Sequence, residues 1–114
     1  AAIMALGDVT TGEAIFKKCA ACHSIKEEGA NKIGPMLYGV VGRKVGHVSD
    51  YKYSKALASY GKEWTFEELN GFLTKPGSYL KGTKMSYAGL RKEADRASVI
   101  KYLNQNSDNP KPLP

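Results

Sequence analysis

Apolar residues recur at helical spacing in several stretches of the chain, with polar residues between them. In the last of these stretches, Ala97, Ile100 and Leu103 lie three residues apart, which gives a helix one continuous apolar stripe. Apolar spacing also predicts helices at about residues 9–20 and from Thr65 to just before Pro76, and the last helix at about 93–104. A short further candidate, residues 54–60, is closed by Gly61. Few strand signals accompany them, so the pattern predicts an all-α fold.

Two of the predicted helices carry a signal at their start. Asp8 precedes the first helix and can cap it through its carboxylate. Thr65 and Glu68 have the spacing of a capping box at the start of the third, with Trp64 and Leu69 as its hydrophobic staple. The third helix therefore has the best-defined start in the chain.

Two long segments between the predicted helices follow neither the helix nor the strand period. Residues 24–53 are rich in glycine, and residues 75–89 form a shorter segment of the same kind. Loops longer than roughly 12 to 15 residues are uncommon in compact domains unless they have a function. We therefore expect these segments to wrap around something.

The length and the cysteine count limit how this domain can be stabilised. The chain has 114 residues, the size of one domain, which we assign to residues 1–114 with its core at about 7–104. Residues 105–114 are rich in Asn, Asp, Ser and Pro, which predicts a flexible C-terminal tail. A domain this short has a limited apolar core unless a further group is enclosed. Two cysteines allow at most one disulfide, which excludes a multi-bridge scaffold.

Charge and the first residues add expectations about partners and location. Lys and Arg number 17 against 11 Asp and Glu, and the formal charge of +6 favours an acidic partner. No nucleic-acid-binding motif accompanies this charge, so we expect no nucleic-acid partner. The longest apolar run, residues 1–6, is too short to span a bilayer. Because the chain begins with alanine and no basic segment precedes that run, we expect an exported protein whose signal peptide has been removed.

The sequence Cys-Ala-Ala-Cys-His at residues 19–23 is the one local motif that specifies a chemistry. The pattern Cys-x-x-Cys-His is the attachment signature of c-type haem. The thiols of Cys19 and Cys22 would form thioethers with the porphyrin, and His23 would bind the iron. A helical turn over these residues would hold all three side chains for one haem.

Three other uses of these residues fit less well. A thioredoxin-like redox pair lies at a helix start in a βαβ unit, whereas Cys19 and Cys22 lie at the end of a predicted helix. A zinc site could use both cysteines with His23 and His47, but the second half lacks the paired histidine spacing. A plain disulfide would leave the glycine-rich loops with nothing to wrap.

A haem iron bound by His23 has one further axial position. The residues that could fill it are Met4, Met36, His47 and Met85. Met36 follows closely after His23, so we expect it to pack on the same side of the haem as that histidine. Met85 lies in a polar, turn-rich loop in which no helical stripe accounts for it, so the pattern favours Met85 and leaves the others open.

At these positions the chain resembles the class I c-type cytochromes, and within them the bacterial cytochrome c2 branch, close to mitochondrial cytochrome c. The resemblance runs from residue 7 to about residue 104, and besides residues 19–23 it includes segments 34–43 and 81–90 and Trp64. It implies the cytochrome c fold, with about four to five short helices and long glycine-rich loops around one covalently bound haem c.

The resemblance also implies roles for individual residues. His23 and Met85 would be the axial ligands, and Pro35 would accept a hydrogen bond from the His23 imidazole. Gly12 would let the first helix cross the last one closely. The other haem contacts that it implies come from Arg43, Tyr53 and Trp64 at the propionates and from Thr83 on the Met85 side.

The function that the resemblance implies is one-electron transfer and not catalysis. A monomeric carrier would take electrons from a cytochrome bc complex to a terminal oxidase, a photosynthetic reaction centre or a reductase. Its expected location is the periplasm, or alternatively the mitochondrial intermembrane space, with at most peripheral membrane contact. Lysines near the haem segments, among them Lys18, Lys32 and Lys84, would steer acidic partners to the haem edge. The alternative is a small peroxidase-like haem enzyme with a labile sixth ligand.

Overall fold

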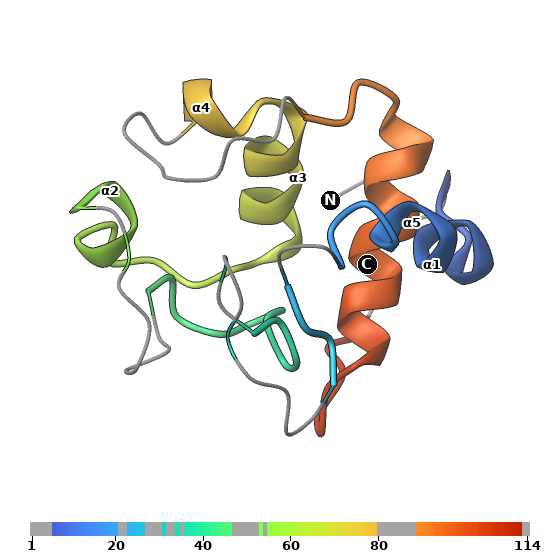
Figure 1. The fold of residues 1–114 in the computed structure, drawn as a ribbon, viewed down its shortest axis with the longest axis horizontal. Coiled ribbons are helices and arrows are strands. Elements are labelled where there is room, and N and C mark those ends of the chain that lie inside the picture. Colours follow the sequence, from blue (N-terminus) through green and yellow to red (C-terminus); the bar gives the residue numbers. More distant parts are fainter. Residues whose placement is uncertain are drawn as a thin grey trace.

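The structure is a computed structural model that describes residues 6–20, 23–26, 31, 34, 36–46, 53, 55–79 and 89–112. Five helices lie within these ranges: α1 (Val9–Phe16), α2 (Lys55–Ala58), α3 (Phe66–Thr74), α4 (Pro76–Tyr79) and α5 (Glu93–Gln105). The helix α1 packs on α5, α5 also contacts α3, and α3 contacts α4 (Figure 1). In these ranges no strand is formed, and the only bridge pairs Lys44 with Glu63. The predicted all-α fold is confirmed.

Four helices agree with the prediction in place, and one was not predicted. The helix α1 ends at Phe16, and hydrogen-bonded turns continue the chain to Ala20. The single-turn helix α4 begins at Pro76, which the sequence indicated only as the end of α3. A proline without an N–H suits the first position of a helix, so the same residue ends one helix and starts the next. None of the helices in the described ranges is long and apolar enough to cross a membrane.

The first and last helices cross at very short range. A Cβ added at Gly12 would overlap the Ser98 carbonyl of α5, so only glycine permits this approach. Beside the crossing, the Phe16 and Tyr102 rings pack with their centroids 5.5 Å apart. The Asp8 N–H donates to the Ser98 hydroxyl at 3.0 Å, which ties the start of α1 to α5. The close crossing that the resemblance implied at Gly12 is confirmed.

The predicted caps are present, one of them only in part. The Asp8 carboxylate accepts a hydrogen bond from the Thr11 N–H at 3.0 Å, as an N-cap should. At the start of α3, the Thr65 hydroxyl accepts from the Glu68 N–H at 3.1 Å. The return half of the predicted capping box is wrong, because the Thr65 N–H donates to the Glu63 carbonyl at 3.0 Å. The Glu68 carboxylate binds other partners.

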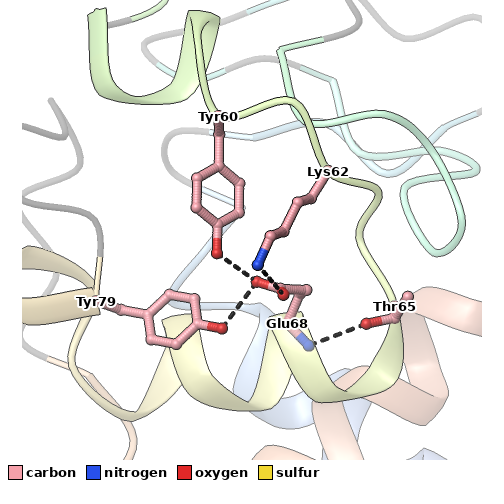
Figure 2. A network of polar contacts seen from close by, with 5 residues as sticks. All are labelled: Tyr60, Lys62, Thr65, Glu68 and Tyr79. Carbon is pink, nitrogen blue, oxygen red and sulfur yellow. Dashed lines mark hydrogen bonds and ion pairs between the residues drawn. The ribbon is translucent and has the colours of Figure 1, made fainter.

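Those partners form a polar network that joins the segment after α2 to α3 and α4. Figure 2 shows Tyr60, Lys62 and Tyr79 converging on the Glu68 carboxylate. The two tyrosine hydroxyls donate to the same oxygen, at 2.7 Å from Tyr60 and 2.8 Å from Tyr79. The Lys62 ammonium lies 3.7 Å from the other oxygen. One carboxylate therefore fixes the segment after α2 and the helix α4 to the first turn of α3.

This network makes part of the stability dependent on pH. Desolvation raises the pKa of Glu68, but the hydrogen bonds from Tyr60 and Tyr79 and the charge of Lys62 lower it below its ordinary value of 4.5. A carboxylate with a lowered pKa in the folded state stabilises the fold at neutral pH. That contribution is lost as the pH falls below 4.5 and through the lowered pKa.

Replacing Glu68 by glutamine is expected to lower the free energy of unfolding at neutral pH by roughly 1–2 kcal/mol, because hydrogen bonds to a charged acceptor become neutral ones. Urea unfolding as a function of pH measures this loss, and the difference from the parent should vanish once the pH lies well below 4.5. Substituting the exposed Glu63 by glutamine is the matched control. A difference that persists unchanged in acid would contradict the assignment.

The core combines apolar side chains from helices and loops. Its members are Phe16, Val40, Val41, Val45, Trp64, Leu69, Phe72, Leu73, Ala97, Val99, Ile100 and Leu103. The Trp64 and Phe72 rings lie 5.1 Å apart between centroids. Three valines come from the glycine-rich loop, where glycines with positive φ at 39, 42 and 46 turn the chain so that Val40, Val41 and Val45 face inward.

The C-terminal tail makes specific hydrogen bonds where the structure describes it, and its predicted flexibility stays a prediction. The Asn104 side chain donates to the Lys111 carbonyl and accepts from the Lys111 N–H, each at 2.9 Å. The Tyr38 hydroxyl donates to the Asp108 carboxylate at 2.9 Å. The polar residues on which that prediction rests also supply hydrogen-bonding groups such as the Asp108 carboxylate. The tail as far as Lys111 lies against the glycine-rich loop.

Candidate haem site

The motif residues that the structure describes lie on one helical turn after α1. The Cys19 N–H donates to the Phe16 carbonyl at 2.8 Å, and the His23 N–H donates to the Cys19 carbonyl at 2.9 Å. The second bond spans four residues, which is the spacing of an α-helical turn. Cys19 and His23 are both half-buried. The first and last residues of the motif, Cys19 and His23, therefore have the backbone hydrogen bond of the predicted helical turn.

The His23 imidazole lies directly on the backbone of the glycine-rich loop. A Cβ added at Gly34 would overlap the Cε1 atom of that ring and lie 2.7 Å from both Nδ1 and Nε2. The φ of Gly34 is not positive, so glycine is needed at this position for space and not for backbone conformation. The loop thus fixes the imidazole from one side, as an axial ligand requires.

Met36 and Arg43 face one another across the same loop. The Arg43 Nη1 group donates to the Met36 carbonyl at 2.9 Å and contacts the Met36 sulfur at 3.4 Å. The Asn31 side chain accepts from the Met36 N–H at 2.9 Å. The sequence did not single out Asn31, although an Asn among glycines is a common loop-fixing residue. The Met36 thioether is therefore held against Arg43.

The Arg43 guanidinium has one donor without a partner. Its Nε is buried and makes no hydrogen bond. Desolvation lowers the pKa of Arg43, and the nearby Tyr53 opposes that shift. An arginine stays charged in proteins, so this half-buried guanidinium with a buried, unpaired Nε favours an anionic partner. The carboxylates of haem propionates are partners of that kind, so the described residues fit a haem at this point.

Two further residues of the predicted propionate site lie next to Arg43. Trp64 is buried. Its backbone N–H donates to the Arg43 carbonyl at 2.8 Å, and its backbone carbonyl accepts from the Gly42 N–H at 2.7 Å. Tyr53 is half-buried and close enough to Arg43 to act on its charge. The structure therefore brings together the three residues Arg43, Tyr53 and Trp64, whose proximity the resemblance implied.

The remaining predicted site residues lie outside the described ranges. They are Cys22, Pro35, Thr83 and Met85, together with the steering lysines Lys32 and Lys84 and the alternative ligands Met4 and His47. Of the named lysines, Lys18 is described, and it is exposed immediately before Cys19. The roles of all these residues stay predictions.

Comparison with known proteins bears on the whole chain. A family model described as cytochrome c matches residues 9–107. A cytochrome c homolog of Bradyrhizobium diazoefficiens is 43% identical over 98% of this chain and 61% of its own length. Cytochrome c of Gibberella zeae is 44% identical over 91% of the chain and 99% of its own length. Cytochrome c2 of Agrobacterium tumefaciens is 46% identical over 85% of the chain and 90% of its own length.

The lengths of these relatives differ. The chain spans 61% of the Bradyrhizobium protein and 58% of the Rickettsia bellii homolog, but nearly all of the fungal protein. The family match covers both the turn at residues 19–23 and the Arg43 region, so motif, geometry and similarity coincide on the same residues. The chain belongs to the cytochrome c family, whose members carry one covalently attached haem c.

Proposed function

We propose that this chain carries single electrons, with His23 and Met85 as the axial ligands of one haem iron. The observation that supports the proposal most is the Cys19–His23 turn: the His23 N–H donates to the Cys19 carbonyl at 2.9 Å, and the imidazole packs against Gly34. Family members are electron-transfer proteins and not enzymes. The haem, when bound, supplies an iron that alternates between the ferric and ferrous states.

The chain's own residues would hold this group and shield it. Cys19 and Cys22 would attach it covalently, and Gly34 would keep the His23 imidazole from rotating. Arg43 would direct its unpaired Nε toward a propionate carboxylate, a charge-assisted hydrogen bond that compensates for burial. Val40 and Val41 are buried in the same loop and would help to exclude water. A rigid and dry site changes little with oxidation state, which suits repeated electron transfer.

Ligand binding tests this function against the peroxidase-like alternative. A carrier with both axial positions filled by protein should bind neither cyanide nor carbon monoxide readily, and it should titrate with a single one-electron midpoint. A haem enzyme with a labile sixth ligand would bind either small molecule rapidly. Rapid and complete binding of carbon monoxide to the ferrous protein would reject the carrier.

We further propose that the carrier docks on acidic redox proteins through lysines around the haem edge. Lys17 and Lys18 support this, because both are exposed immediately before Cys19. In this proposal Lys32 and Lys84 belong to the same surface. The partners would be a cytochrome bc complex as donor and an oxidase, reaction centre or reductase as acceptor. The monomer would work in the periplasm, a location that the similarity to Agrobacterium cytochrome c2 supports.

Electron transfer to an acidic partner is expected to slow as ionic strength rises, because salt screens the attraction between exposed charges. Stopped-flow rates at increasing salt measure this. Lys18→Gln should flatten the salt dependence, whereas Lys55→Gln should leave it unchanged, since Lys55 lies on α2, at the opposite side of Figure 1 from α1. Equal effects of the two substitutions would indicate an undifferentiated basic surface.

A further inference from the structure

The residues after α5 return to the glycine-rich loop and bind it at three points. The Gly39 N–H donates to the Asn106 carbonyl at 2.8 Å. The Tyr38 hydroxyl donates to the Asp108 carboxylate at 2.9 Å. At Gly42 the Lys111 side chain lies so close that an added Cβ would overlap it. We call the three residues that make these contacts, Asn106, Asp108 and Lys111, the clasp.

The clasp is itself anchored to α5. Asn104 is 6% exposed, and its amide forms two reciprocal bonds with the Lys111 backbone, each at 2.9 Å. The Asn106 amide donates to the Tyr102 carbonyl at 2.8 Å. Without the tail, the Asn104 side chain would lose both of these partners at a buried position, which is costly for a polar group. The tail therefore completes the end of α5 and is not merely laid over it.

The loop that the clasp binds is the one that carries Arg43. The Arg43 N–H donates to the Val40 carbonyl at 3.0 Å, and its Nη1 donates to the Met36 carbonyl at 2.9 Å. The guanidinium thus takes its position from residues 36–43. The clasp holds positions 38, 39 and 42 of the same segment from the outside, so it limits how far the guanidinium can move.

Two members of the clasp lie beyond the part of the chain that matches the family model, which ends at residue 107. We propose that the clasp is a positioning device of this chain: it fixes the Arg43 loop and keeps it dry, and through Arg43 it raises the reduction potential of the haem. This inference rests on the proposed function, since it needs a redox-active haem next to Arg43.

The expected direction follows from electrostatics. A buried positive charge acts more strongly on a nearby ion than a hydrated one, because the local dielectric constant is lower. A cation near the iron disfavours the extra positive charge of the ferric state. Loosening the loop would admit water to Arg43, weaken this effect and favour ferric haem. Solvent exposure is one of the features that set the potentials of iron centres.

The test compares holoprotein variants by potentiometric titration. A chain that ends at Ser107 removes Asp108 and Lys111, and Tyr38→Phe removes one clasp bond with little risk to folding. We expect the truncation to shift the ferric–ferrous equilibrium two- to fivefold toward ferric, which is roughly 20–40 mV at about 59 mV per tenfold change for one electron. Tyr38→Phe should shift it in the same direction by less. Asn109→Ala is the matched tail control and should leave the potential unchanged.

The outcomes are separable. Lower potentials in the truncation and in Tyr38→Phe, with Asn109→Ala unchanged, support the clasp. Unchanged potentials with a reduced melting temperature would show a purely structural tail and overturn the inference. A full shift reproduced by Lys111→Gln alone would assign it to that charge and overturn it too. If the truncated chain does not fold, Asp108→Ala decides in its place. Absence of covalently bound haem in the parent would instead reject the proposed function.

Discussion

Replacing Met85 by alanine is expected to lower the midpoint potential by on the order of 100 mV or more, because axial ligands set haem potentials over a range of about 0.8 V. A thioether stabilises the ferrous state relative to nitrogen or oxygen ligands, so its loss favours ferric iron. The substitution should also abolish the near-infrared charge-transfer band of methionine-ligated ferric haem. Optical redox titration and the ferric near-infrared spectrum measure the two effects.

Met36→Ala is the matched control for this experiment. The Met36 sulfur lies 3.4 Å from the Arg43 Nη1 group, so this thioether contacts Arg43. The backbone carbonyl of residue 36, which accepts from the same Nη1 group, remains after the substitution. The near-infrared band should survive in Met36→Ala. A band that persists in Met85→Ala and disappears in Met36→Ala would reverse the assignment of the sixth ligand.

Replacing Gly34 by alanine is expected to displace the His23 imidazole. The added methyl group would overlap Cε1 of the ring, and because the φ of Gly34 is not positive, the cost is steric. Overpacking of this kind reduces the free energy of unfolding by roughly 1–3 kcal/mol. Since His23 is the proposed axial ligand, the Soret band and the midpoint potential of the holoprotein should change as well.

Gly77→Ala provides the control, because nothing lies within 4 Å of a Cβ at that position of α4. Chemical unfolding followed by absorbance measures stability and the haem environment together. A Gly34→Ala protein with the stability and spectrum of the Gly77→Ala protein would mean that Gly34 does not constrain the imidazole.

Much of the helical framework could be predicted from local signals. The Asp8 cap and the apolar stripe of α5 follow from residue type and spacing, and both are present in the structure. The half-formed capping box marks the limit of this reasoning. Glu68 has the right spacing to Thr65, but the hydroxyls of Tyr60 and Tyr79 offer its carboxylate better partners from outside the helix. Spacing along one helix does not reveal such competitors.

The site shows the same division. The motif at residues 19–23 specifies its chemistry within five residues, because covalent attachment and ligation need a fixed local arrangement. The unpaired Nε of Arg43 and the contact of Gly34 with His23 depend on how the glycine-rich loop folds back onto the motif. That loop has neither helical nor strand periodicity from which its path could be predicted. Composition also does not reveal the partners of the tail: its polar residues predict flexibility, and which loop residue Asp108 binds emerges only from the fold.

Cys19 and Cys22 are expected to attach a haem that the chain uses for electron transfer. The most direct measurement is the visible spectrum of the protein, produced in a host that attaches c-type haem, before and after extraction with acidified organic solvent. We expect a red, low-spin protein that keeps its haem after extraction, with the spectrum of a haem joined by two thioethers. The Cys19→Ser, Cys22→Ser double variant should lose any bound haem to the solvent. A haem that the solvent removes from the parent protein, or a parent protein without haem, would contradict this expectation.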